Sequence, residues 1–236
     1  MFSKTTHILA AIAAILFVAM GAIFAQGPQP TVIPLPFVSS LFGDNMVLQR
    51  GKPDAIWGWS DPGDTIRVQF EQQIAIAVAG ADRRWQTKIL PPAAGGPYTV
   101  KITGRSQTVE IKNVLVGDVW LCGGQSNMGV GLSQARNGAD EAKAADQPEI
   151  RYYNVPENKA YTHRDIAPNG AWKAVTPDTA RGVSAVAYYF ARRVRDDVHV
   201  PIGLLQDNVG GTPAEGWTSP EALHAVGDFE VPLAVV

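Results

Sequence analysis

Gly-Asp-Val-Trp-Leu-Cys-Gly-Gly-Gln-Ser-Asn-Met, residues 117–128, is the stretch that decides the fold, because an apolar strand runs directly into a glycine turn. The segment Val119–Cys122 is apolar enough for a buried strand, and the glycines that follow it let the backbone turn sharply. A helix that starts after such a turn has unpaired backbone N–H groups, which can face an oxyanion. Ser126 therefore stands where a hydrolase would carry its nucleophile.

The same turn has plainer explanations. A serine in a glycine turn after a strand commonly serves as a helix cap. The segment is not a G-x-S-x-G elbow, because Met128 stands in place of the last glycine, and no Gly-Lys-Ser/Thr follows for a phosphate loop. Cys122 lies inside the apolar run, where we expect a buried small hydrophobe and not a thiol nucleophile. Spacing alone leaves Ser126 as either a cap or a nucleophile.

Upstream of this stretch, residues 30–116 have the pattern of an antiparallel sheet. Apolar and polar side chains alternate within Ile66–Phe70 and within Tyr98–Ile102, as in half-buried strands. Clusters of turn-forming residues, such as Asp61–Asp64 and Pro91–Pro97, separate these segments. Short strands at this spacing predict an N-terminal antiparallel β-sandwich.

Downstream, residues 117–236 contain longer units in which strands alternate with helices. We predict a helix over residues 133–145 and a strand over residues 150–154. Ser184 is a suitable N-cap for a further helix, which leads to the apolar strand Pro201–Leu205. A helix followed by a buried strand indicates a crossover connection in a mostly parallel sheet.

A second glycine turn follows that last strand, within Val209–Trp217. Gly210 and Gly211 permit positive φ and close approach of a ligand, so their N–H groups could serve an oxyanion hole. Turns at the carboxyl ends of parallel strands lie where open α/β sheets bind ligands. The alternative is a turn that only connects two elements.

Three segments carry a family resemblance: Leu41–Arg50, Gly117–Met128, and Val200–Leu205 leading into Gly210–Ser219. Together they resemble the sialate O-acetylesterase family of the SGNH-type hydrolases. The resemblance implies a β-sandwich ahead of an α/β SGNH-like three-layer domain. It also implies a carbohydrate O-acetylesterase that uses no metal and no cofactor and acts on an O-acetylated sugar.

The resemblance also implies roles for individual residues. Ser126 would be the nucleophile that forms an acetyl-enzyme, and its own N–H would join Gly210 and Gly211 in the oxyanion hole. Asp118, Asn127, Glu215 and Trp217 are further candidates for a role in the site. For Asp118 and Glu215 the alternative role is that of a structural hydrogen-bond partner, and for Trp217 it is that of a core residue. The candidates for substrate binding are Asn127, Glu215 and Trp217.

The general base and its orienting acid have no match in the sequence. Members of the family typically continue with a Gln-Gly-Glu segment and a terminal Asp-x-x-His, and neither occurs before Val236. We therefore expect an incomplete hydrolase domain that is inactive on its own, with His163 and His199 as surface residues. His224 follows the Trp217–Pro220 loop and could approach the top of the sheet, but it does not match the Asp-x-x-His. Two alternatives stay open: a non-catalytic carbohydrate-binding or scaffold protein, and an esterase for acetylated polysaccharides such as xylan.

The N-terminal sequence and the composition indicate where the protein is located and which partners are excluded. Lys4 and His7 precede an apolar run over residues 8–25, so we interpret residues 1–25 as a secretory signal, with an uncleaved anchor as the alternative. We expect a secreted or periplasmic protein. The net charge of −2 and the lack of a lysine and arginine cluster exclude nucleic acid as an expected partner. A single cysteine excludes intrachain disulfides.

Overall fold

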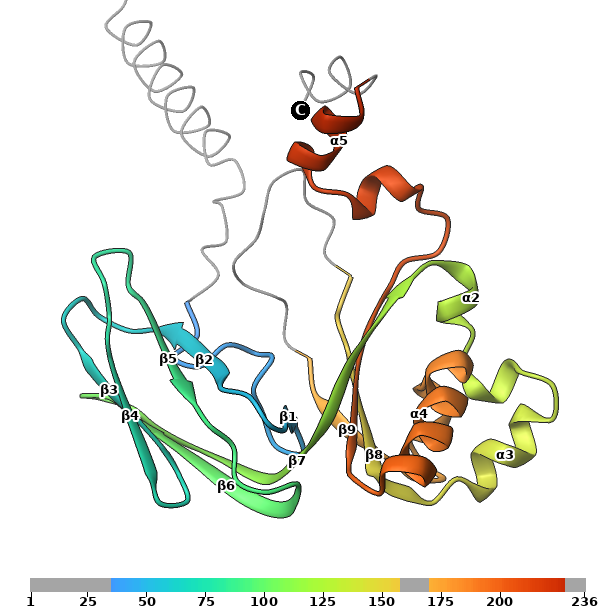
Figure 1. Cartoon of the computed structure of the whole chain (residues 1–236), viewed down its shortest axis with the longest axis horizontal. Coiled ribbons are helices and arrows are strands. Elements are labelled where there is room, and N and C mark those ends of the chain that lie inside the picture. Colours follow the sequence, from blue (N-terminus) through green and yellow to red (C-terminus); the bar gives the residue numbers. More distant parts are fainter. Residues whose placement is uncertain (1–34, 158–169, 228–236) are drawn as a thin grey trace, which may run out of the picture. The chain divides into compact units, whose positions relative to one another are not determined.

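One long strand, β7, connects an antiparallel and a parallel group of strands (Figure 1). The computed structural model describes residues 35–157 and 170–227, so the predicted signal at residues 1–25 lies outside the described residues. Eight strands form a mixed sheet in the order β4-β3-β6-β7-β10-β8-β9, and β1 pairs with β7 beside this path. A separate two-stranded sheet consists of β2 and β5.

The strands are β1 (Val47–Gln49), β2 (Asp54–Trp59), β3 (Thr65–Phe70), β4 (Gln73–Val78), β5 (Arg84–Ile89), β6 (Gly95–Thr103), β7 (Thr108–Gly124), β8 (Gln147–Asn154), β9 (Trp172–Val175) and β10 (Ile202–Asn208). The helices are α2 (Ser126–Gly129), α3 (Gly138–Ala144), α4 (Ala185–Val198) and α5 (Pro220–Val226), with short 3-10 turns η1 (Leu132–Gln134), η2 (Ala180–Gly182) and η3 (Ala214–Trp217).

The antiparallel group follows the alternation seen in the sequence. Strands β4, β3, β6 and the first part of β7 pair antiparallel, and alternate side chains of β3 are fully buried. Trp85 of β5 is 1% exposed, and its indole Nε1 donates a hydrogen bond to the Phe37 carbonyl at 2.9 Å. The β2–β5 pair therefore contributes large side chains to the same core as the antiparallel strands.

The parallel group consists of the last part of β7 together with β10 and β8. Strand β10 lies between the other two and is parallel to both, whereas β9 pairs antiparallel with β8 at the end of the sheet. Figure 1 shows α4 and α3 together on one side of these strands. On that side α4 buries Ala187, Tyr188 and Ala191, next to Ile202 and Leu204 of β10. The predicted mostly parallel sheet is confirmed for β7, β10 and β8.

Polar side chains fasten β7 where its partners change. The Arg50 guanidinium donates two hydrogen bonds to the Asp118 carboxylate, Nε to Oδ1 at 2.8 Å and Nη2 to Oδ2 at 2.9 Å. The Gln49 side chain accepts a hydrogen bond from the Val119 N–H at 2.9 Å. The Asp118 N–H donates to the Pro201 carbonyl at the start of the pairing with β10. Asp118 is therefore a structural partner, one of the two roles that the sequence left open.

Two expectations about local structure need correction. The helix expected over residues 133–145 is shorter, because η1 comes first and α3 begins only at Gly138. A Cβ at Gly138 would lie 1.8 Å from the Leu132 carbonyl oxygen, so a tight turn there interrupts the helical spacing. The strand expected over residues 150–154 begins earlier, at Gln147. The Ser184 cap is confirmed, since its hydroxyl accepts from the Ala187 N–H at 3.3 Å.

No helix in residues 35–157 and 170–227 is both long enough and apolar enough to cross a bilayer.

We expect Gly117→Ala to destabilise the protein by about 2 kcal/mol or more, because overpacked sites force the backbone to shift. A Cβ at Gly117 would lie 1.9 Å from the Pro201 carbonyl oxygen, which is held in the β7–β10 pairing. Gly43→Ala is the matched control, since a Cβ there meets nothing within 4 Å. Urea unfolding measures both, and equal stability of the two variants would contradict the close approach at Gly117.

A second prediction concerns Asp54, the first residue of β2. Its Oδ2 is buried without a hydrogen-bond partner among the described residues, and burial raises the pKa of this carboxyl from 3.8 to about 6. The folded state thus holds a proton that the unfolded state releases, and folding stability falls as the pH rises from about 4 to above 6. We expect Asp54→Asn to raise the thermal midpoint at pH 7.5 and to change it little at pH 4.

Calorimetry at the two pH values measures this difference, with Asp61→Asn as the control because the Asp61 carboxylate is largely exposed. A lower midpoint for Asp54→Asn at pH 7.5 would show that the ionised carboxylate is instead stabilised in the folded protein.

Candidate active site

Ser126 is the first residue of α2, and only Gln125 separates it from the end of β7. Gly124 has φ of 149°, a conformation that side chains rarely adopt, and it turns the chain out of the strand. The Gly129 N–H donates to the Gln125 carbonyl at 2.9 Å and closes the single turn of α2. Ser126 and Asn127 are both exposed, so the serine hydroxyl is open to solvent.

The second glycine turn lies beside the first. Asn208 pairs in register with Gly124, so β7 and β10 end level with each other, and the Val209 N–H then donates to the Gly124 carbonyl at 3.1 Å. A Cβ placed on Gly210 would lie 3.7 Å from Ser126 Oγ. Two segments that are 84 residues apart in the chain therefore meet at the serine hydroxyl.

Thr212 holds the second turn in shape. Its hydroxyl donates to the Val209 carbonyl at 2.7 Å and accepts from Trp217 Nε1 at 2.8 Å. Gly211 has φ of 78°, in the left-handed region that favours glycine. Trp217 is 41% exposed and Glu215 is exposed, so both side chains remain on the surface near this turn. The core position considered for Trp217 is wrong.

A base for Ser126 is absent from the part of the chain that the structure describes. The Ser126 hydroxyl has no hydrogen-bond partner within residues 35–157 and 170–227. His199 follows α4 and precedes β10, so it lies toward the amino end of that strand, whereas Ser126 lies at the carboxyl end. His224 is exposed on α5, and His163 lies outside the described residues. The described residues thus supply a serine and its glycine turn.

A polar pocket of about 270 Å³ opens next to α2, at the carboxyl ends of β8 and β10. Gln206, which is 3% exposed, accepts from the Ser184 N–H at 2.5 Å and donates to the Asn154 carboxamide oxygen. This buried amide ties β10 to β8 and to the start of α4. Sequence reasoning assigned no role to Asn154, Gln206 or Asn208, although polar residues that close apolar strands are a recognisable signal.

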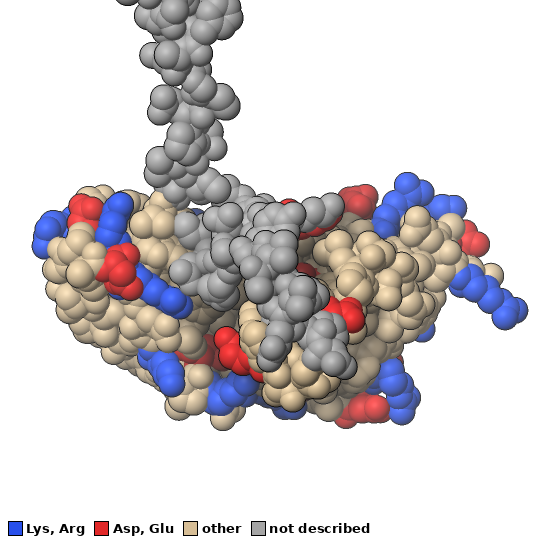
Figure 2. Space-filling model, turned by 90° about the horizontal axis from the view of Figure 1, so that it is seen from above, with Lys and Arg blue, Asp and Glu red and all other residues tan. Residues whose placement is uncertain are grey.

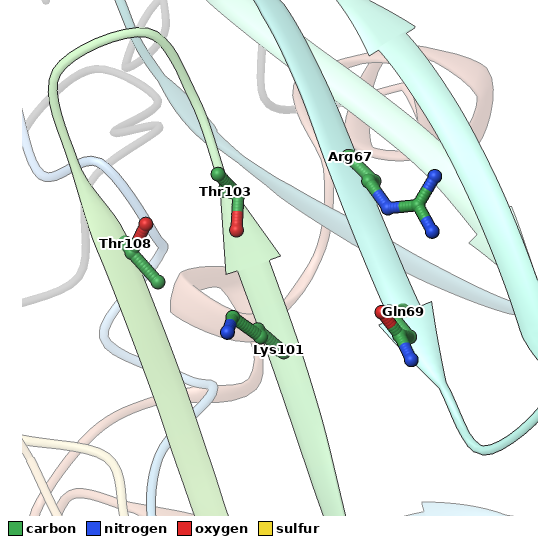
Figure 3. Close-up of a pocket in the computed structure, with 5 residues that line it drawn as sticks. All are labelled: Arg67, Gln69, Lys101, Thr103 and Thr108. Atoms are coloured by element: carbon green, nitrogen blue, oxygen red, sulfur yellow. The ribbon is translucent and has the colours of Figure 1, made fainter.

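A second hollow, of about 350 Å³, lies on the outer side of β3, β6 and β7 and has a different composition (Figure 3). Figure 3 shows its five lining side chains: Arg67, Gln69, Lys101, Thr103 and Thr108. Lys101 also forms an ion pair with Glu110 at 3.6 Å. Thr108 and Gly124 are the two ends of β7, so this hollow is far from Ser126. Its one lysine, Lys101, is paired with Glu110, and the candidate site stays at Ser126.

The remaining titratable groups do not suggest another reaction centre. Cys122 is 6% exposed and burial raises the pKa of its thiol, which confirms the expected buried hydrophobe. The described residues contain no group of three His, Cys, Asp or Glu side chains that could hold a metal ion. Figure 2 shows basic and acidic side chains interspersed on the face that it presents.

Comparisons with known proteins show which families this chain is similar to. Residues 116–226 match the family described as carbohydrate esterase, sialic acid-specific acetylesterase. The chain is 31% identical over 208 residues to the sialate O-acetylesterase of Homo sapiens and 32% identical over 212 residues to that of Mus musculus. These matches cover 80% of this chain but only 40% and 38% of those proteins.

A solved structure is also similar over most of the chain. A carbohydrate acetylesterase from Xanthomonas citri is 37% identical, with a TM-score of 0.77 over 82% of this chain and 44% of that one. The chain therefore spans about two-fifths of the length of these relatives.

We expect Gln206→Leu to destabilise the protein by about 1–3 kcal/mol, because it leaves the Ser184 N–H and the Asn154 carboxamide without their buried partner. Gln69→Leu is the matched control, since Gln69 is exposed on the outer side of the sheet. Urea unfolding compares the two. If Gln206→Leu lowered the free energy of unfolding no more than Gln69→Leu does, the buried Gln206 carboxamide would contribute nothing to stability.

Proposed function

Since the chain belongs to the sialic acid-specific carbohydrate acetylesterase family through its residues 116–226, we propose that the protein hydrolyses acetyl esters on sugar hydroxyls, with Ser126 as the nucleophile. The names of its relatives, sialate O-acetylesterase and carbohydrate acetylesterase, support an acetylated sugar as the substrate. The single observation that carries the proposal is the approach of Gly210 to Ser126 Oγ at the level ends of β7 and β10.

This approach suits the charge that ester hydrolysis creates. Attack on an acetyl carbonyl turns its oxygen into an oxyanion, which needs N–H donors already in position. The proposed donors are the N–H groups of Ser126 and Gly211, with Gly210 shaping the turn so that no side chain blocks the hydroxyl. Loss of one such donor typically costs about 10²- to 10³-fold in turnover.

The reaction would proceed in two steps. Ser126 Oγ bonds to the acetyl carbon, the ester C–O bond breaks, and the sugar leaves with the proton that the serine gave up. Water then attacks the acetyl-enzyme, its proton returns to Ser126 Oγ, and acetate leaves. Both steps need a general base to move the proton. We place that base and its orienting acid outside the described residues, in an Asp-x-x-His segment of the kind that the family resemblance implies.

We also propose the finer organisation of the fold. Residues 30–116 would form a β-sandwich, with the β2–β5 pair facing the antiparallel strands, and residues 117–236 would begin an SGNH-type three-layer domain. The edge of β7 supports this proposal. Over residues 118–124 one edge pairs with β10, and no strand in the described part of the chain pairs with the other. Leu121 on this stretch is 71% exposed. Further parallel strands could extend the sheet there.

The N-terminal sequence supports a proposal about the location of the protein. We propose export, to the periplasm or outside the cell, because the uncharged apolar run over residues 8–25 has the features of a secretory signal.

Asn127, Glu215 and Trp217 are proposed to contact substrate, since all three are exposed and lie near the two turns.

For the protein expressed from its native gene, we expect Ser126→Ala to lower kcat/KM for acetate release by about 10⁴-fold or more, because no other group can form the acyl-enzyme. Release of 4-nitrophenol from 4-nitrophenyl acetate and of acetate from O-acetylated N-acetylneuraminic acid measures the loss.

Ser106→Ala is the matched control, since Ser106 is an exposed serine in the turn between β6 and β7. Full turnover in Ser126→Ala would exclude Ser126 as the nucleophile. No acetate release by the unaltered protein would favour a carbohydrate-binding protein over an enzyme.

A further inference from the structure

We propose that the polar pocket beside α2 binds one sugar ring of the ester, and that Asn208 is the residue that selects it. The proposal rests on the proposed esterase function and adds the substrate portion that this pocket takes. With about 270 Å³, the pocket is just below the roughly 300–1,000 Å³ typical of small-molecule sites, so it suits a single ring better than a run of several.

The position of the pocket relative to the nucleophile is the first argument. Met128 and Gly129 line it, and they follow Ser126 by two and three residues on the same short helix. At 1.5 Å per residue, these positions lie within about 5 Å of Ser126 along the helix axis. A ring held in the pocket would therefore lie within reach of an ester carbonyl placed at Ser126 Oγ.

The polarity of the wall is the second argument. The pocket is bounded mainly by polar groups, with Met128 and Val155 as its apolar side chains. The polar groups are the side chains of Asn154, Glu157, Ser184, Gln206 and Asn208 and the backbone at glycines. Sugar hydroxyls need hydrogen-bond partners when they leave water, whereas an acetyl methyl group gains nothing from polar walls. The wall thus fits the alcohol portion of the ester.

The hydrogen bonds already present single out Asn208. Gln206 uses its carboxamide on the Ser184 N–H and on Asn154, so it positions the wall and does not bind ligand. The Asn154 Nδ2 also donates to the Gly182 carbonyl at 3.5 Å. The Asn208 carboxamide has no hydrogen-bond partner within the described ranges, and Asn208 is only partly exposed. Its donors and its acceptor are therefore available to a ligand.

The backbone fixes Asn208 in place. It pairs in register with Gly124 and stands two residues before Gly210, the residue that approaches Ser126 Oγ. Its Oδ1 lies 3.1 Å from the position of a Cβ on Gly129, which directs the carboxamide toward α2. Gln206 and Asn208 are two residues apart on β10, so their side chains share one face of the strand. The buried carboxamide of Gln206 therefore lies next to the unpaired carboxamide of Asn208. Such a rigid support is what a selective hydrogen bond requires.

The kinetic test uses Asn208→Leu in the protein expressed from its native gene. This change keeps the branched shape of the side chain and removes its hydrogen bonding. The measured quantity is the ratio of kcat/KM for O-acetylated N-acetylneuraminic acid to kcat/KM for 4-nitrophenyl acetate, which has no sugar. We expect this ratio to fall tenfold or more, because a site built to hydrogen-bond its ligand loses selectivity when a partner is removed. Gln69→Leu, in the hollow of Figure 3, should leave the ratio unchanged.

A binding test separates this proposal from the proposed function. N-Acetylneuraminic acid without an O-acetyl group is titrated into the Ser126→Ala variant and into the double variant Ser126→Ala with Asn208→Leu. NMR chemical shifts give the dissociation constant for each. We expect binding at least tenfold weaker in the double variant. Should Asn208→Leu fail to fold, Asn208→Ala, which also removes the carboxamide, replaces it in both tests, with the same expected falls.

The outcomes are distinguishable. If the kcat/KM ratio of Asn208→Leu lay within twofold of the ratio of the unaltered protein, or if the two dissociation constants were equal, Asn208 would not be the residue that selects the sugar. Sugar binding that depends on Asn208 in a protein that releases no acetate would overturn the esterase proposal and support the pocket.

Discussion

The parallel pairing of β7 with β10 is the interaction on which the candidate site depends. Seven consecutive pairs, from Ile202 with Asp118 to Asn208 with Gly124, make the two strands end at one level. Each strand continues into a glycine turn, and only this register brings Gly210 to Ser126 Oγ. A shift by one residue would turn every side chain to the other face of the sheet and separate the two turns.

Two sets of polar contacts hold this pairing at its ends. At the start, Asp118 is fixed by Gln49, the last residue of β1, and by Arg50, which follows it. At the finish, Gln206 joins β10 to β8 and to the N-terminus of α4. Between them the faces of the strands are apolar, with α4 on one side and the core of the antiparallel group on the other. Packing thus supports the strands, and hydrogen bonds set their position along the sheet.

Local patterns in the sequence were sufficient to predict the strand before Ser126, the Ser184 cap and both glycine turns. They could not predict that β7 runs unbroken from the antiparallel to the parallel group, because strand pairing depends on residues far apart in the chain. The helix expected from residue 133 was wrong for a local reason, since the chain turns tightly between Leu132 and Gly138 and leaves η1 and α3 as separate elements. Asn208 gained its place in the candidate site only from the register with Gly124.

The most direct test of the account is a crystal structure of the protein after reaction with an activated methylphosphonate ester, which mimics the tetrahedral intermediate of acetyl transfer. The account predicts phosphorus bonded to Ser126 Oγ, with a free phosphonyl oxygen about 3 Å from the N–H groups of Ser126 and Gly211. Phosphorus on another residue, or a phosphonyl oxygen directed away from the Gly210–Gly211 turn, would contradict it.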